Sequence, residues 1–222
     1  IDEFEKEFKD DVFGTQLILL MKKAYQKGKT LTEATQILVQ ELFSEFGLLM
    51  IDGDNVLLKN QMAEIFSSEL KDEITHHFSK ENVQFLSEKY GKVQVNPREI
   101  NLFYLSDTRN RIVRKGNQFE VLDKNLNFSF EEITNDFSKI SPNALLRPVF
   151  QEKVLPNIAY IGGNAEIMYW LELPEVFKQF GVAFPVLIPR NSMLFLRSKT
   201  YKKIKKSGLD LLDFFGNFQT KL

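Results

Sequence analysis

The chain has 222 residues, of which 43% are hydrophobic and 21 are Phe, a composition typical of a folded protein with a packed core. Its 29 basic and 30 acidic residues leave a net charge of −1, so no overall field attracts nucleic acid or an anionic membrane. Cysteine is absent, which excludes disulfides, thiolate metal sites and a cysteine nucleophile and suits a reducing cytoplasm.

Residues 1–46 are predicted to form a helical segment. Apolar residues recur at helical spacing, and Thr30 followed by Glu33 forms a capping box that opens the last helix of the segment. Gly47 is expected to end this helix. We expect the helix to bury one apolar stripe, made of Leu31, Ala34, Ile37, Leu38, Leu42 and Phe46.

Residues 47–91 are predicted to begin with a strand at 48–52 and to continue as helix. The run LLMID is short and continuously apolar, which is typical of a strand covered on both faces. In open α/β sheets ligands bind at the carboxyl ends of such strands, so Asp52 and Asp54 are candidate ligand contacts. The alternative is that both residues only turn the chain and cap the next helix.

Residues 92–140 are predicted to form an inserted β-meander. The expected strands lie at 92–96, 100–105, 111–115 and 119–123, with turn residues between them. Ser129 followed by Glu132 is a second capping box that restarts helix. Before the meander, His76 and His77 are adjacent on a helix and cannot bind one metal as an i, i+4 pair would, so we expect surface histidines and no metal site.

Three prolines divide residues 141–156, and Pro148 is expected in the first turn of a short helix that ends before Pro156. Arg147 would then lie beside the N-terminus of this helix. A guanidinium combined with the positive end of a helix dipole can bind a carboxylate or a phosphate. The alternative is a structural ion pair.

The stretch AYIGGNAEIMYW (159–170) has the order strand, two glycines, helix. The strand is expected at 157–161, with Asn164 as the helix cap. Gly162 and Gly163 would let a ligand approach bare backbone, and Glu166 suits the hydroxyls of a ribose or sugar, or an ammonium, better than a pyrophosphate. The alternative is that the glycines serve close packing and Glu166 satisfies the helix dipole.

FPVLIPRNSMLFL (184–196) has a second buried-strand pattern, interrupted by polar residues. Arg190, Asn191 and Ser192 form either a turn or the lip of a site. If they form a lip, we expect them to line the same cleft as Arg147 and the two glycines, where they would contact an anionic ligand.

Four stretches of the chain resemble the cysteine-adding enzymes of bacillithiol biosynthesis, the cysteine ligases of that pathway. They are SPNALLRPVFQEKVLPNIAYIGGNAEIMYW (141–170), FPVLIPRNS (184–192), FGLLMIDGDN (46–55) and VQVNPREINLFYL (93–105). The resemblance runs in order through nearly the whole chain. The sequence departs from the family at Asn164-Ala165, where Pro or Gly with another small residue is more frequent, and at Glu172, where Gln is usual.

The resemblance implies an α/β fold, with a Rossmann-like core similar to class I aminoacyl-tRNA synthetases and helical and β-meander insertions. Residues 47–91 and 141–197 would belong to the core, and 198–222 would begin a C-terminal helical coiled coil that makes a dimer. Because the family's chains are more than twice as long, we expect a middle fragment whose catalytic residues are not assigned. The residues implied to bind substrate or nucleotide are Asn143, Arg147, Gln151, Gly162, Gly163, Asn164, Glu166, Arg190, Asn191 and Ser192.

The implied reaction joins the carboxyl of cysteine to the amine of glucosaminyl malate in the cytoplasm, the last step to bacillithiol. The carboxylate must be activated before the amine attacks, for which an acyl adenylate made from ATP is the leading option, and the sequence leaves the activator open. Two alternatives remain from the residues: a non-catalytic nucleotide- or sugar-binding fragment, or a sugar-nucleotide transferase of similar fold.

Overall fold

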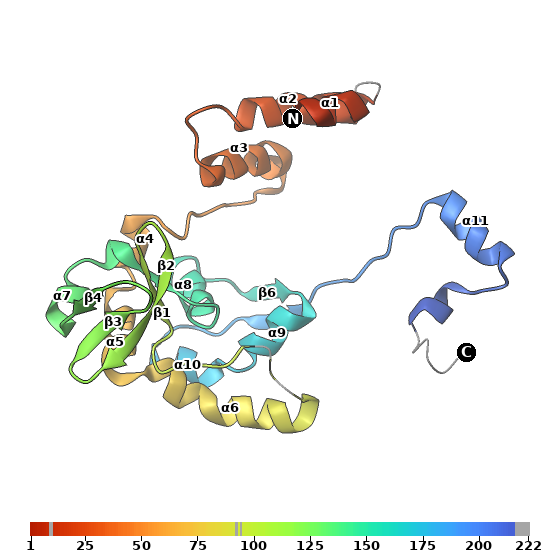
Figure 1. Ribbon diagram of the computed structural model, residues 1–222. Coiled ribbons are helices and arrows are strands. Elements are labelled where there is room, and N and C mark those ends of the chain that lie inside the picture. Colours follow the sequence, from red (N-terminus) through yellow and green to blue (C-terminus); the bar gives the residue numbers. More distant parts are fainter. Residues whose placement is uncertain (9–10, 92, 94, 216–222) are drawn as a thin grey trace.

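Two sheets organise the computed structural model, which describes residues 1–8, 11–91, 93 and 95–215. The larger sheet is antiparallel, with the strand order β4-β3-β2-β1-β5, and the smaller is the parallel pair β6-β7 (Figure 1). The strands are β1 (Leu102–Leu105), β2 (Arg109–Lys115), β3 (Gln118–Val121), β4 (Leu126–Phe128), β5 (Ile140–Pro142), β6 (Ala159–Gly162) and β7 (Val186–Pro189).

The N-terminal helices lie apart from the sheets (Figure 1). They are α1 (Asp2–Phe8), α2 (Val12–Ala24) and α3 (Leu31–Phe43), followed by the short helix η1 (Ser44–Phe46). The capping box is confirmed, because the Thr30 amide donates to Glu33 Oε2 over 2.7 Å and the Glu33 amide donates to Thr30 Oγ1 over 3.2 Å. The expected buried stripe is wrong: Ala34 is buried, but Leu31 and Phe46 are each 74% exposed. Helix α3 packs mainly on α2, so too few neighbouring residues are present to cover its apolar stripe.

The strand expected at 48–52 is wrong, because these residues have no regular structure and Leu49 is 71% exposed. A strand needs a neighbour for its backbone hydrogen bonds, and no described strand pairs with this segment. The acidic turn serves the chain itself: Asp52 Oδ1 accepts from the Asp54 amide over 2.8 Å. Asn55 caps α4 (Val56–Asn60), and Asp54 pairs with the buried Lys59.

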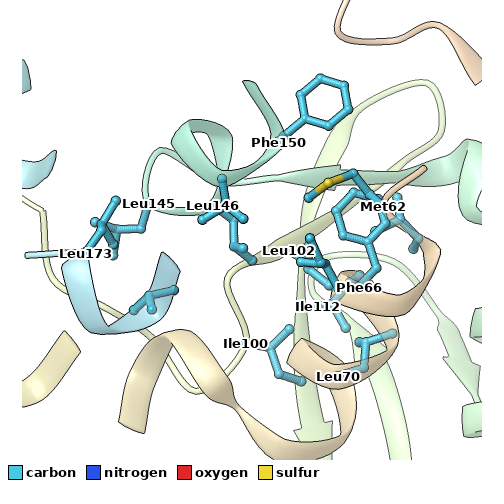
Figure 2. Close-up of a cluster of buried hydrophobic side chains, with 14 of the residues drawn as sticks. Met62, Phe66, Leu70, Ile100, Leu102, Ile112, Leu145, Leu146, Phe150 and Leu173 are labelled. Carbon is cyan, nitrogen blue, oxygen red and sulfur yellow. The ribbon is translucent and has the colours of Figure 1, made fainter. Parts of the chain in front are cut away.

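The main core lies between the antiparallel sheet, the β6-β7 pair and the helices around them. These helices are α5 (Ala63–Asp72), α6 (Ile74–Tyr90), α7 (Phe130–Thr134), η2 (Phe137–Lys139), α8 (Leu146–Val154), α9 (Asn164–Trp170) and α10 (Pro174–Gln179). Figure 2 shows side chains from α5, the sheet and α8 meeting in one buried cluster. Among them are Met62, Phe66, Leu102, Ile112 and Leu146. Burial of these apolar side chains is the main source of stability for this part of the chain.

The meander prediction is confirmed for three strands. Those expected at 100–105, 111–115 and 119–123 are β1, β2 and β3, and Ser129 with Glu132 opens α7 as a capping box. Two of the residues expected in a strand at 92–96 lie outside the described residues, and the described ones are not in a strand. Strands β4 and β5 were not expected. The sequence ISP of β5 contains a proline, which a sheet tolerates at its edge, where β5 lies.

The C-terminal residues leave the core after β7 and end in α11 (Ser198–Lys206) and η3 (Leu211–Phe215) (Figure 1). The second apolar run of the 184–196 pattern forms no strand, and Phe195 is 87% exposed. Helix α11 falls where the coiled coil was expected to begin, and residues 216–222 of that region lie outside the described residues. The coiled coil therefore stays a prediction.

A buried carboxylate, that of Glu69, joins three parts of the fold. Glu69 Oε2 accepts from the amide and hydroxyl of Thr75, over 2.9 and 2.8 Å, at the start of α6. Its Oε1 accepts from the amide and side chain of Asn101, over 3.0 and 2.9 Å, at the entrance to β1. Burial raises the pKa of Glu69, although all four donors act to lower it.

We predict that Glu69→Ala lowers the free energy of unfolding by about 3 kcal/mol, because it leaves buried amide and hydroxyl donors without an acceptor. Urea unfolding followed by circular dichroism measures the change. Glu64→Ala is the matched control, since Glu64 lies on the same helix and is exposed. Equal stability of the two variants would contradict the role given to Glu69.

Candidate functional site

Helix α8 presents Arg147 in its first turn, as the proline pattern predicts. The helix spans Leu146–Val154, with Pro148 in the first turn and Pro156 beyond its end. Asn143 precedes the helix and stabilises its N-terminal end, because Asn143 Oδ1 accepts from the amides of Leu145 and Leu146 over 2.9 and 3.1 Å. The Arg147 side chain is exposed and forms no ion pair within the described part of the chain. The structural ion pair considered as an alternative is therefore not formed.

A cavity of about 300 Å³ lies between α8, β6 and α9, a size at the lower end for small-molecule sites. Arg147 and Gln151 of α8 supply its polar groups. Its wall includes Trp170, which stacks on Tyr160 with ring centroids 4.0 Å apart at 18°. The full lining is Ile51, Arg147, Pro148, Phe150, Gln151, Tyr160, Tyr169 and Trp170.

The buried Glu152 fixes the start of the strand that borders this cavity. Its carboxylate accepts from the amide and side chain of Asn157, over 2.7 and 3.0 Å, just before β6. It also accepts from Gln151 Nε2 over 2.9 Å, which orients one of the cavity residues. One carboxylate thus positions both β6 and Gln151.

The glycines lie where the two parallel strands end. The register pairs Gly162 with Pro189, and the Arg190 amide donates to the Gly162 carbonyl over 2.7 Å. A Cβ on Gly163 would lie 3.0 Å from Arg190 Nη2, and one on Gly162 would lie 2.6 Å from a ring carbon of Tyr160. Both glycines therefore serve close packing. At Gly163 the absence of a side chain lets the Arg190 guanidinium lie against the backbone.

Glu166 caps its own helix. Its Oε2 accepts from the Gly163 amide over 2.7 Å, so Gly163 is the N-cap of α9. The expectation that Asn164 is the cap is wrong: Asn164 is the first helical residue and is exposed. Glu166 supplies one half of a capping box, in which the carboxylate at the third helical position accepts from the N-cap amide, and Gly163 has no side chain to supply the other half.

The Glu166 carboxylate also lies close to the two tyrosines of the cavity. Burial, together with the neighbouring Tyr169 and Glu166, raises the pKa of Tyr160 to about 12. Burial and Glu166 also raise the pKa of Tyr169, while the positive charge of Arg147 lowers it. Both phenols therefore stay protonated at neutral pH and are available as donors.

The structure brings some of the predicted residues together and leaves others apart. Arg147 and Gln151 line the cavity, Glu166 lies near its tyrosines, and Arg190 covers Gly163. Asn143 lines a different cavity and is bonded to Asn101. Asn164, Asn191 and Ser192 are exposed.

Tyr160, Tyr169 and Trp170 were not among the predicted site residues, yet they line the cavity. The signals were present: Tyr160 precedes Gly162 by two, hence on the same face of the strand, and Tyr169 follows Glu166 by three on the helix. Tyr169 and Trp170 serve as packing and cavity wall at once.

The described residues contain no group of three or more His, Cys, Asp or Glu that could hold a metal. His77 is 61% exposed at its side chain, as expected of a surface histidine, whereas Nδ1 of His76 is buried without a described partner. Among the described residues, no helix is both long and apolar enough to cross a membrane.

A parallel strand pair joined through helices, with glycines and an arginine at the carboxyl ends of the strands, is an arrangement typical of Rossmann-like α/β proteins. Residues 1–191 match the family model for the N-terminal Rossmann-like domain of BshC, of bacillithiol biosynthesis. The chain belongs to this family.

Curated relatives support the assignment, each carrying the name "Putative cysteine ligase BshC". The chain is 36% identical to the protein of Flavobacterium johnsoniae over 220 residues, covering 97% of this chain and 41% of that one. It is 38% identical to that of Flavobacterium psychrophilum over 203 residues and 36% identical to that of Cytophaga hutchinsonii over 200 residues. Each of these two matches covers 88% of this chain and 38% of the relative. The chain thus spans about two-fifths of the length of these relatives.

We predict that Gly162→Ala lowers the free energy of unfolding by about 1 to 3 kcal/mol, because the added methyl meets a Tyr160 ring held by its stack on Trp170. Gly163→Ala should cost less, since the Arg190 side chain can move away. Urea unfolding of both variants tests the order. A larger loss for Gly163→Ala would show that Arg190 is the more rigid neighbour.

Glu172, one of the departures from the family pattern, is fully buried, and neither carboxylate oxygen has a hydrogen-bond partner among the described residues. Burial raises its pKa from 4.5 to about 8. The folded protein therefore keeps a proton that the unfolded chain loses near pH 4.5, and the stability associated with Glu172 falls as the pH rises from there to about 8.

We predict that Glu172→Gln stabilises the protein at pH 9 and has little effect at pH 5, because the amide is neutral at both values and the carboxyl only at the lower one. Denaturant midpoints of both proteins at pH 5, 7 and 9 measure the difference. A difference that is independent of pH would contradict the burial of a titrating carboxyl.

Proposed function

We propose that the full-length protein joins the carboxyl of cysteine to the amine of glucosaminyl malate, in the cytoplasm. The observation that carries this proposal is the family membership, together with relatives named as cysteine ligases. The cavity between α8, β6 and α9 supports it, since it offers a cation and phenol donors to a small polar substrate. A homodimer formed through a coiled coil is part of the same proposal.

The chemistry requires an activated carboxyl, because a carboxylate is a poor acceptor for an amine at neutral pH. We assign ATP as the activating nucleotide, which would supply an adenylyl leaving group. The residues fit such a group: Arg147 and Arg190 are cations near the site, and Glu166 is an acceptor for ribose or sugar hydroxyls. Tyr160 and Tyr169 remain protonated and would orient the substrate by donating hydrogen bonds.

Removing the charge of Arg147 tests the site. We predict that Arg147→Gln in the full-length protein lowers kcat/KM about 10- to 100-fold through a lost charge-assisted hydrogen bond, with an unchanged melting temperature. Amide formation from cysteine, glucosaminyl malate and ATP is followed by mass spectrometry. Lys153→Gln removes the same charge from an exposed position of α8 and should leave the rate unchanged. A kcat/KM for Arg147→Gln equal to that of the unmodified enzyme would contradict the role given to this site.

The same assay tests two further parts of the proposal. The 222 residues alone should be folded and inactive, since they cover about two-fifths of the relatives and reacting groups must be held together. Omitting ATP should abolish amide formation, and product formed without ATP would contradict the proposed activator.

Variants of Glu166 test its role in nucleotide binding by calorimetric titration. Glu166→Gln keeps an oxygen for the Gly163 amide and removes the charge, whereas Glu166→Ala also removes the cap. Reduced nucleotide affinity in both variants would assign a binding role to the carboxylate.

A further inference from the structure

A second polar cavity lies on the outer face of the antiparallel sheet, and it shares Asn143, but not Arg147 or Gln151, with the candidate binding residues. The register pairs Phe103 with Arg111 and Leu105 with Arg109 across β1 and β2. Side chains two residues apart on a strand share a face, so Arg109, Arg111 and Phe103 lie together. The buried Leu102 and Ile112 belong to the opposite face, which packs on the core.

Arg109 is held in place on this face. Its guanidinium carbon lies 4.0 Å from the centre of the Phe103 ring, and its Nη2 donates to the Pro142 carbonyl over 2.7 Å. These contacts occupy one face and one nitrogen of the guanidinium and leave its other donors for a ligand. An arginine fixed in this way loses little conformational entropy when it binds.

Arg98 joins the two strand arginines around a cavity of about 350 Å³, large enough for a small ligand. Asn96 adds an amide group to the same wall, whereas the amide of the buried Asn101 is already bonded to Glu69 and to the Arg98 carbonyl. Three guanidinium groups and the amide of Asn96 form a wall rich in hydrogen-bond donors, which is the chemistry that recognises carboxylate or phosphate oxygens.

None of the three arginines forms an ion pair within the described ranges of the chain. Glu120, which lies opposite Val113 on the same face, pairs with Lys115 over 2.9 Å. Glu99 lines the adjoining cavity that Arg98 and Arg111 also border, without pairing with either. The cluster therefore has a surplus of positive charge in a protein whose net charge is −1.

A fourth arginine adds to this surplus. Burial lowers the pKa of Arg109, and so does the positive charge of Arg147 at the start of α8. The two guanidinium groups are thus close enough to repel one another. Such repulsion makes a negatively charged ligand more favourable at this position.

We propose that the cavity lined by Arg98, Arg109 and Arg111 binds a small anion through its carboxylate or phosphate groups. This cavity is distinct from the one beside Tyr160 and Trp170, which none of the three arginines lines, although Arg147 lies close enough to Arg109 to influence both. Arg109, already fixed on Phe103, orients the anion. Arg98, in the loop before β1, and Arg111, on β2, contact it from two further sides.

Calorimetric titration of the full-length protein at low salt tests the proposal with two probes, malate and inorganic phosphate. Malamide, which has the shape of malate without its charge, is the control ligand. We expect at least one anion to bind, malamide not to bind, and the affinity to fall as salt is added. The tighter probe identifies whether dicarboxylates or phosphates are the natural class. Binding of neither anion, or equal binding of malamide, would overturn the site.

The double variant Arg98→Gln/Arg111→Gln locates the binding. Both side chains are exposed and make no hydrogen bond or ion pair in the part of the chain that the structure describes, so the variant should fold normally, which an unchanged melting temperature verifies. We expect about a 10- to 100-fold loss of anion affinity. Arg197→Gln, one exposed arginine outside the cavity, should change it less than twofold. An unchanged affinity in the double variant, or an equal loss in Arg197→Gln, would refute the proposal.

Discussion

The buried carboxylate of Glu69 is the interaction on which the arrangement of the core depends. It accepts four hydrogen bonds, two from the start of α6 and two from the residue that leads into β1. Asn101 in turn binds Asn143, whose side chain starts α8. One polar chain thus runs from α5 through the antiparallel sheet to the helix that carries Arg147. Every buried donor and acceptor in this chain of hydrogen bonds needs a partner, because a buried polar group without one destabilises the fold.

The parallel pair β6-β7 positions Arg190 and Glu166 by a different principle, which is steric. Both strands end at the same edge, and the glycines at the end of β6 leave room that any side chain would fill. Arg190 occupies part of this room, and Glu166 satisfies the exposed amide of Gly163. The alternatives weighed for the glycines and for Glu166 are therefore not exclusive, since a carboxylate that caps a helix also lies beside the cavity tyrosines.

Charge in this protein is local rather than global. A net charge of −1 describes the whole chain, yet the face of β1 and β2 gathers arginines that no carboxylate neutralises among the described residues. The pairs that form explain the difference: Glu120 pairs with Lys115, and Glu99, which borders the adjoining cavity, pairs with neither Arg98 nor Arg111 among the described residues. Counting charges in a sequence cannot reveal this, because the strand register selects which pairs form.

The sequence by itself determined the local structure: both capping boxes, the limits of α8 set by Pro148 and Pro156, and the order strand, glycines, helix around Gly163. These features depend on residues within a few positions of one another. The tertiary structure decided what depends on distant partners. It left residues 48–52 without a neighbouring strand, exposed Leu31 on a helix expected to bury it, and brought Tyr160 and Tyr169 beside Arg147. Burial and pairing require a second segment, and neither periodicity nor propensity identifies which segment that is.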